Sequence, residues 1–272
     1  MNSFISEKNG KLSKLALIYL SDLSYSALRS ALRKKDVKIN GVRTDKDVAL
    51  CVGDKVEIYY KPIETKGYSV VFADENVLVV NKKSGFTSES VYQSILNENE
   101  NAFFIHRLDR NTSGLMIFAL NDVAEKELLF GFKNRTFDKL YKARVKGMPE
   151  PKKAVLTAYL FKDQKNSLVT VTDKKVVGST QIITGYEVVS VSDSYSDLIV
   201  TLYTGKTHQI RAHLAHIGNP ILGDGKYGDF ALNNKLKLKR QLLTAVSLTL
   251  KFEKDSPLYY LNGKTFTVDS EF

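Results

Sequence analysis

From Tyr68 onward the chain is dominated by short segments with the composition of β-strands, and no helix separates them regularly. β-Branched and aromatic residues concentrate in these segments, as is typical of strands. A doubly wound parallel sheet needs a helix between successive strands, so this order argues against that fold. It predicts an α+β fold with a mainly antiparallel or mixed sheet flanked by helices. The strand-like segments are Val77–Asn81, Leu115–Leu120, Leu140–Lys146, Ala154–Leu160, Ile182–Val189, Asp197–Tyr203 and Val246–Phe252.

Helical signals occur at two places in this part of the chain. Ala124–Lys133 follows Asn121-Asp122, which suits a helix N-cap. Thr207–Ile217 is followed by Gly218, a residue that is common just past a helix C-terminus. Near the end of the chain, Asn262-Gly263 predicts a last hairpin.

The first 62 residues follow a different order of elements. Pro62 and the polar residues 64–67 read as a linker, so we expect two domains, residues 1–62 and 63–272. Ser24 is the expected N-cap of the second helix of the small domain. Two short helices, a strand and a tight turn are predicted over Leu15–Leu20, Ser24–Leu32, Val37–Ile39 and Asn40-Gly41.

The distribution of charge separates the same two regions. The chain has 40 Lys and Arg against 30 Asp and Glu, a formal net charge of +10. Residues 1–62 hold 12 basic and 7 acidic residues, so half of the surplus lies on less than a quarter of the chain. Such a surplus favours a polyanion, either nucleic acid or an acidic membrane surface. Nothing amphipathic accompanies the charge, so we expect nucleic acid as the partner and no membrane association.

The polar side of the second predicted helix is strongly basic, and its candidate RNA contacts are Arg29, Arg33, Lys34 and Lys35. The order of elements over about residues 12–60 resembles the small RNA-binding domain named after ribosomal protein S-four. One difference is Lys14-Leu15-Ala16, where that domain often has Arg-Leu-Asp. The alternative is a solvated basic helix on an unrelated domain. Since the charge and turn signals agree, RNA binding is the preferred interpretation.

Several common sites have no support in the sequence. Gly205-Lys206-Thr207 is like the end of a phosphate-binding loop, but Val200 stands where that motif needs glycine. No Gly-x-Gly-x-x-Gly follows a strand, which argues against dinucleotide binding. Cys51 is the single cysteine, so a disulfide-stabilised secreted scaffold is excluded. Residues 1–11 lack an apolar signal core and no apolar run could span a bilayer, so a soluble cytoplasmic protein is expected.

Three of the four histidines, His208, His213 and His216, lie close together. Spacings of five and three do not place all three on one helical face, and no paired acidic ligand accompanies them. We therefore expect structural or RNA-contacting histidines, with no metal and no cofactor.

The stretch from His106 to Leu115, HRLDRNTSGL, contains the strongest candidate for chemistry. Asp109 lies between Arg107 and Arg110, and nearby cations favour the ionised carboxylate. An ionised, positioned carboxylate can act as a base or a nucleophile. A salt bridge at a surface turn is the common alternative. Local chemistry alone leaves both interpretations open.

Five segments together resemble the RluA family of pseudouridine synthases, and the resemblance covers about residues 68–252. This chain differs from the family pattern at Lys83, where proline is usual, at Lys206, which replaces arginine, and at Thr244, where histidine is common. None of these positions is expected to do chemistry. The segments are residues 77–86 (VLVVNKKSGF), 106–115, 137–147 (FDKLYKARVKG), 204–228 (TGKTHQIRAHLAHIGNPILGDGKYG) and 242–245 (LLTA).

The resemblance implies a pseudouridine synthase fold and the isomerisation of uridine to pseudouridine in RNA. It implies that Asp109 is the catalytic carboxylate and that Arg211 is its partner, whose guanidinium fork can hold both carboxylate oxygens. Tyr141 would pack on the target base, and Arg107 would fill the space of the flipped nucleotide. The implied partner is ribosomal RNA or tRNA, bound by a monomer that needs no protein partner.

Two other function classes remain as alternatives. One is a non-catalytic RNA-binding or ribosome-assembly protein on the same fold, against which Asp109, Tyr141 and Arg211 argue together. The other is a glycosidase or nucleosidase, which needs a second carboxylate at a suitable distance. No second acid stands out in the matching segments.

Overall fold

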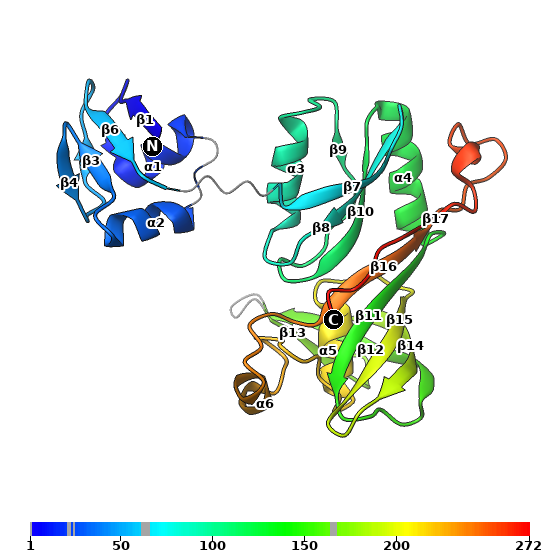
Figure 1. Cartoon of the computed structure of the whole chain (residues 1–272). Coiled ribbons are helices and arrows are strands. Elements are labelled where there is room, and N and C mark those ends of the chain that lie inside the picture. Colours follow the sequence, from blue (N-terminus) through cyan, green and yellow to red (C-terminus); the bar gives the residue numbers. More distant parts are fainter. Residues whose placement is uncertain (1, 21–22, 24, 61–65, 164–167) are drawn as a thin grey trace. The chain divides into compact units, whose positions relative to one another are not determined.

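The computed structural model divides the chain into two compact units, Met1–Thr65 and Lys66–Phe272 (Figure 1). It describes residues 2–20, 23, 25–60, 66–163 and 168–272. The domain boundary expected between residues 62 and 63 lies outside the described residues, as does Ser24, the expected cap of the second helix. Each unit has a hydrophobic core of its own. Within the described ranges, every helix is too short or too polar to span a bilayer.

The N-terminal unit packs two helices against a four-stranded sheet with the strand order β1-β6-β3-β4. Leu12 and Leu28 from the helices and Val56 from the sheet are completely buried in its core. Asn40 and Gly41 have positive φ angles of 49° and 83° and join β3 to β4, which confirms the predicted tight turn. The elements are β1 (Asn2–Ile5), β2 (Gly10–Lys11), α1 (Leu12–Tyr19), α2 (Tyr25–Arg33), β3 (Val37–Ile39), β4 (Val42–Thr44), β5 (Ala49–Leu50) and β6 (Lys55–Ile58).

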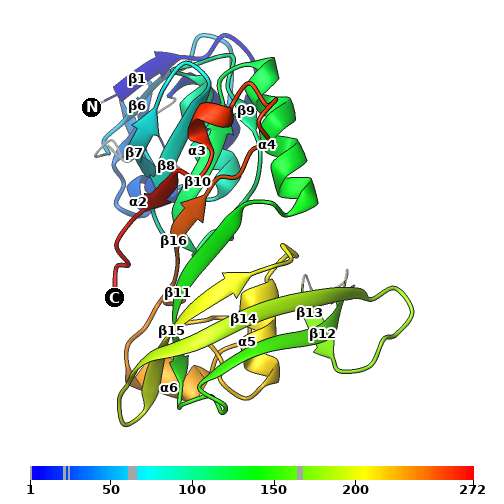
Figure 2. The same cartoon turned by 90° about the vertical axis from the view of Figure 1, so that its right-hand side faces the viewer.

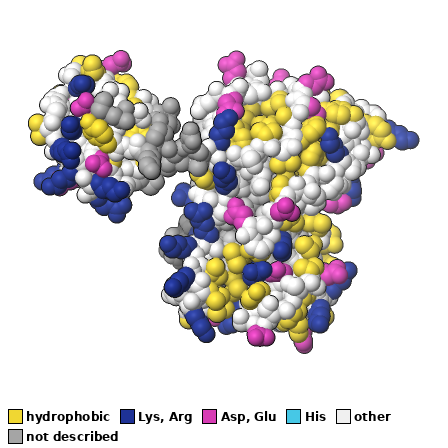
Figure 3. All heavy atoms as spheres, in the orientation of Figure 1, with side chains coloured by type: hydrophobic (Ala, Val, Ile, Leu, Met, Phe, Trp, Pro, Cys, Tyr) yellow, Lys and Arg dark blue, Asp and Glu magenta, His cyan; other side chains and the backbone are white. Residues whose placement is uncertain are grey.

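The candidate RNA contacts of this unit are all exposed. Arg29 and Arg33 lie on α2, and Lys34 and Lys35 follow it directly. The Lys35 ammonium lies 4.0 Å from the carboxylate of Asp45. Figure 3 shows Lys and Arg side chains gathering along one side of the unit. The fold therefore leaves an accessible basic surface at the positions that the sequence indicated.

The C-terminal unit is built on one eleven-stranded mixed sheet, which confirms the predicted α+β class (Figures 1 and 2). Its main strand order is β13-β12-β14-β15-β11-β16-β10-β8-β7. β10 and β16 run parallel, and the other strand pairs described in this sheet run antiparallel. The elements are β7 (Tyr68–Ala73), β8 (Val77–Lys82), α3 (Ser88–Leu96), β9 (Phe103–Phe104), β10 (Ser113–Ala119), α4 (Asp122–Asn134), β11 (Asp138–Lys146), β12 (Lys153–Asp163), β13 (Leu168–Thr172), β14 (Thr180–Val191), β15 (Tyr195–Leu202), α5 (Gln209–His216), α6 (Phe230–Lys235), β16 (Leu243–Thr249), the 3-10 helix η1 (Tyr259–Leu261) and β17 (Thr265–Thr267).

Hydrophobic cores lie on both faces of β10. Met116 and Phe118 belong to the core shared with α3 and α5, whereas Leu115 and Ile117 belong to the core shared with α4. Every residue of β10 is therefore buried. This is why the strand reads in the sequence as an unbroken apolar run without polar alternation.

All the predicted strands of this unit occur. Both predicted helices of this unit also form, one of them with a later start than expected. Asn121 caps α4 as predicted, since its side chain accepts a hydrogen bond from the Ala124 N–H at 2.9 Å. The helix expected over residues 207–217 begins later, at Gln209, because His208 has a left-handed φ of 56°. The last hairpin pairs β16 with β17, but its connection also holds η1 and is longer than a tight turn.

The parallel strands β10 and β16 approach each other very closely at Gly114. A Cβ atom there would lie 2.2 Å from the carbonyl oxygen of Ala245, and the φ angle of Gly114 is +113°. Only glycine fits such a position. The same pairing puts the Ser113 hydroxyl 2.8 Å from that of Thr244. The close pairing of β10 with β16 therefore fixes the position at which the loop that carries Asp109 enters the sheet.

Candidate active site

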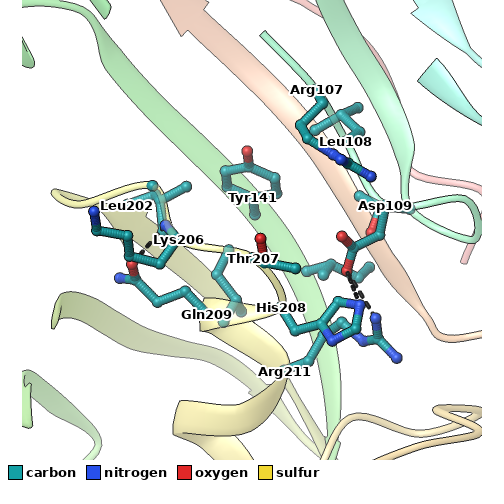
Figure 4. A pocket seen from close by; sticks show the side chains of 14 residues that line it. Arg107, Leu108, Asp109, Tyr141, Leu202, Lys206, Thr207, His208, Gln209 and Arg211 are labelled. Carbon is teal, nitrogen blue, oxygen red and sulfur yellow. Dashed lines mark hydrogen bonds and ion pairs between the residues drawn. The ribbon is translucent and has the colours of Figure 1, made fainter. Parts of the chain in front are cut away.

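Asp109 lies in the loop that leads from β9 into β10 (Figure 4). Side chains from other segments hold the loop on both sides of it. Ser88, at the start of α3, donates to the Leu108 carbonyl and accepts from the Leu108 N–H, both at 2.8 Å. Gln241 donates through Nε2 to the Thr112 hydroxyl at 2.7 Å. The carboxylate is thus attached to a rigid backbone.

Arg211 projects from the first turn of α5 toward Asp109 (Figure 4). Its Nη1 donates to Oδ2 of Asp109 at 2.7 Å. Its Nε and Nη2 donate to the two oxygens of Asp224, at 2.7 and 2.9 Å. The expectation that the guanidinium fork holds both oxygens of Asp109 is therefore wrong. The fork holds Asp224, and one remaining N–H of Arg211 reaches Asp109 through Oδ2.

Asp224 is a second carboxylate that sequence reasoning missed, although it lies in the longest matching segment. Its side chain is fully buried, and Oδ1 also accepts the backbone N–H groups of Lys226 and Tyr227 at 2.8 and 3.1 Å. Burial would raise its pKa, but the hydrogen bonds from Arg211 and the backbone outweigh burial and hold the pKa of Asp224 below its usual value. Asp224 does not line the cavity beside Asp109. It therefore positions Arg211 and offers no second reactive acid of the kind that a nucleosidase needs.

The guanidinium of Arg211 is itself almost buried, with 7% of its side chain exposed. Burial opposes the charge, but Asp224 and Asp109 together raise the pKa of Arg211. The ring of Tyr227 lies 5.2 Å from the guanidinium carbon and adds a cation–π contact. The cation is thus held between two carboxylates and one aromatic ring.

Tyr141 comes from β11 and faces the same cavity as Asp109 (Figure 4). β11 pairs with β16, which pairs with β10, so the sheet brings the tyrosine close to the loop before β10. The tyrosine is 8% exposed. Burial, with a smaller contribution from the charge of Asp109, raises the pKa of Tyr141. The phenol is therefore neutral at pH 7 and presents an aromatic surface to the cavity.

Arg107 lies at the edge of the cavity, and 60% of its side chain is exposed. Its Nη1 is 3.6 Å from Oε1 of Glu89, a contact that solvent screens. The structure thus places Asp109, Tyr141 and Arg211 around one cavity, with Arg107 at its rim.

His208 also lines the cavity, at the N-cap of α5. Its Nε2 lies 3.9 Å from Oδ2 of Asp109, and its Nδ1 lies 2.9 Å from the Tyr227 hydroxyl. Burial lowers the pKa of His208, Asp109 opposes this shift, and Arg211 adds to it. The imidazole is neutral at pH 7 and packs beside the catalytic candidate.

The other two clustered histidines have separate partners. Nδ1 of His213 lies 3.0 Å from the Thr184 hydroxyl, and Nε2 of His216 lies 2.8 Å from Asp173. Over the described part of the chain, no three His, Cys, Asp or Glu side chains converge as they would around a metal ion.

Lys82, at the end of β8, is a further group that sequence reasoning missed. It is fully buried, and its Nζ donates to the carbonyls of Lys83, Phe86 and Arg110 at 3.1, 2.8 and 3.1 Å. Burial lowers the pKa of Lys82 to about 8, against the opposing charge of Asp109. Because Arg110 follows Asp109 directly, this ammonium ties the Asp109 loop to β8.

The chain is similar to proteins of one enzyme class. A family model described as RNA pseudouridylate synthase matches residues 75–216. The dual-specificity RNA pseudouridine synthase RluA of Escherichia coli (strain K12) is 32% identical over 225 residues, which cover 78% of this chain and 98% of that protein. An uncharacterized RNA pseudouridine synthase of Mycobacterium bovis is 29% identical over 266 residues, 88% of this chain and 85% of that protein.

A solved structure shares the fold of the C-terminal unit. Human RNA Pseudouridylate Synthase Domain Containing 1 matches with a TM-score of 0.61 at 23% identity, over 77% of this chain and 92% of that one. Asp109, Tyr141 and Arg211 all lie inside the region that the family model matches. The chain therefore belongs to the RluA-type family of RNA pseudouridine synthases, enzymes that isomerise uridine within RNA.

Proposed function

We propose that this synthase modifies specific uridines in structured RNA, with large-subunit ribosomal RNA as the first candidate substrate and tRNA as the second. We further propose that Asp109 is its catalytic carboxylate. The observation that carries the second proposal is the 2.7 Å ion pair between Asp109 and Arg211, beside Tyr141 in one cavity.

The reaction breaks the bond between ribose C1′ and N1 of uracil and forms a bond between C1′ and C5. The hydrogen on C5 leaves as a proton, and N1, which has lost its bond to C1′, gains a proton. No oxidant and no external group donor is therefore required. Asp109 begins the reaction at the sugar, either by attack on C1′ or by removal of a sugar proton. Both routes need an ionised carboxylate at a fixed position. Arg211 supports that state through one charge-assisted hydrogen bond to Oδ2.

Tyr141 packs against the target base in this proposal. A flat aromatic ring suits a flat heterocycle, and the buried phenol stays neutral while it does so. The uridine reaches the cavity by leaving its base stack, which costs a few kcal/mol. Arg107, exposed at the rim, is placed to occupy the space that the base leaves and to offset part of that cost.

The N-terminal unit is proposed to be an RNA-binding domain like that of ribosomal protein S-four. Its support is the exposed basic surface formed by Arg29, Arg33, Lys34 and Lys35, together with the tight Asn40-Gly41 turn. We propose that the protein acts as a monomer in the cytoplasm without an obligate protein partner.

Product analysis tests the proposed function. Purified protein is incubated with unmodified transcripts of large-subunit ribosomal RNA and of tRNA, and nucleosides and free bases are then quantified by mass spectrometry. The proposal predicts pseudouridine at defined positions in one of these transcripts and no free uracil. Release of uracil would indicate a nucleosidase. Tight binding without product would indicate a non-catalytic RNA-binding protein. Pseudouridine mapping in cells with and without the gene then identifies the modified uridines.

A further inference from the structure

A strongly basic segment, Lys235–Arg240, follows α6 and reads KLKLKR. Its four cations are all exposed, and the sequence from Phe230 to Leu242 contains no Asp or Glu. In Figure 3, Lys and Arg side chains gather over the part of the C-terminal unit where Figure 1 places α6. The local charge is therefore positive and has no neutralising acid within the segment.

The backbone of this basic segment is ordered by hydrogen bonds that close the end of α6. The N–H of Lys237 donates to the Asn234 carbonyl at 3.1 Å, and that of Leu238 donates to the Asn233 carbonyl at 2.9 Å. Lys237 has a left-handed φ of 54°, at a position where helix ends favour glycine or asparagine. These hydrogen bonds fix the backbone of the segment that carries the lysines.

Both ends of the basic segment are fastened to the catalytic machinery. Before it, Asn233 accepts the N–H of Gly223 at 2.6 Å and donates to the Asp224 carbonyl at 3.1 Å. At its end, Arg240 donates through Nη1 to the Ser84 carbonyl at 2.8 Å. The next residue, Gln241, holds the Asp109 loop through Thr112. The cations are thus presented at a fixed place relative to Asp109.

A groove continues from the catalytic cavity to Gln241, the residue that follows the basic segment. It shares five lining residues with the cavity and also includes Gln241, which directly follows Arg240; the shared residues are Arg107, Leu108, Asp109, His208 and Arg211. Apart from Gln241, the rest of its lining has no aromatic and no large aliphatic side chain; it holds two cations and one acid and comprises Thr87, Glu89, Arg110, Asn111, Gly225 and Lys226. Such a lining suits a sugar–phosphate backbone better than an apolar protein surface.

We propose that the RNA strand on one side of the target uridine runs along this groove, and that Lys235, Lys237 and Lys239 bind its phosphates. The proposal rests on the proposed function, because the groove begins at Asp109. RNA is favoured over an acidic protein because the groove is continuous with the cavity that receives the uridine.

The test compares the salt dependence of RNA binding by the full-length protein and by a Lys235→Gln/Lys237→Gln/Lys239→Gln variant. The probes are a large-subunit ribosomal RNA transcript and unmodified tRNA. Each phosphate contact contributes about 0.7 to the slope of log K against log salt for single strands, so the variant should lose about 2 units of slope. If the variant and the wild type bind RNA equally at 1 M salt, this loss of slope makes the variant bind about hundredfold more weakly than the wild type at 0.1 M salt. Arg240 is left in place because it braces Ser84.

A matched control removes the same charge elsewhere on the unit, in a Lys126→Gln/Lys133→Gln/Lys254→Gln variant. These lysines are exposed on or near α4, and α6 lies at the other end of the unit in Figures 1 and 2. The control should keep the wild-type slope. An unchanged slope in the basic-segment variant, or an equal loss in both variants, would overturn the proposal. Wild-type protein from the same preparation must form pseudouridine, so that failure of the proposed function is recognised separately.

Discussion

Replacing Asp224 by Asn tests whether Arg211 must be held by a buried carboxylate before Asp109 can work. Four N–H groups point at the two oxygens of Asp224, two from Arg211 and two from the backbone. An Asn side chain offers one oxygen and one NH2 group, so at least one of these donors meets another donor. Because the site is fully buried, water cannot replace the lost partner.

The size of the effect follows from the kind of interaction that is lost. A hydrogen bond to a charged group contributes about 1.5–3 kcal/mol, and breaking one member of a buried ion pair costs about 3–5 kcal/mol of stability. We expect Asp224→Asn to lose about 2–3 kcal/mol of transition-state stabilisation, since Arg211 no longer presents Nη1 at a fixed position. At 1.36 kcal/mol per tenfold change, turnover should fall about 30- to 160-fold.

The assay is single-turnover pseudouridine formation at saturating protein, with thermal unfolding measured in parallel. Asp197→Asn is the matched control. Asp197 is also buried, and it accepts Nε and Nη2 of Arg144 at 2.6 and 2.9 Å, but it does not line the catalytic cavity. Both variants should unfold at lower temperature, and only Asp224→Asn should turn over slowly. If folded Asp224→Asn retains wild-type turnover, or if Asp197→Asn slows equally, the positioning role is refuted.

Two further predictions concern RNA binding and pH. Deleting residues 1–62 should weaken RNA affinity and flatten its salt dependence, since phosphate contacts release counterions; equal salt slopes in filter binding would contradict this. Burial lowers the pKa of His213 to about 4, below 6.5 in the unfolded chain, so the unfolded state binds more protons between pH 6.5 and 4. The free energy of unfolding should therefore decrease as the pH is lowered through that window, by up to about 1.4 kcal/mol per pH unit, and should decrease less in His213→Gln; denaturation at pH 7 and 5 measures the difference.

The strands and the longest helix could be predicted from the sequence because their signals are local. β10 appears as an unbroken apolar run, and Asn121 caps α4 within three residues of its partner. α3 was missed because its exposed face is rich in small polar residues, although Thr87 caps it by accepting the Ser90 N–H at 3.0 Å. Its apolar residues Val91, Tyr92, Ile95 and Leu96 pack on the core at helical spacing, but the pattern extends over only nine residues.

The candidate site could be predicted only in part, because its geometry depends on contacts that are distant in the sequence. Local chemistry left Asp109 open between a catalytic acid and a surface ion pair, and the family resemblance decided the choice. The division of Arg211 between Asp109 and Asp224 arises from the packing of α5 against two loops, which no local pattern records. Lys82 was missed because lysine is rarely buried, so a lysine at the end of a strand reads as a surface residue.

The most direct test of the account is pseudouridine formation by purified, folded Asp109→Asn protein. Asn keeps the shape of the side chain and an oxygen for the Nη1 hydrogen bond of Arg211, but it removes the charge that both chemical routes need. This variant should form no detectable pseudouridine, and its RNA affinity should stay close to that of the wild type. Turnover at the wild-type rate by this variant would contradict this expectation.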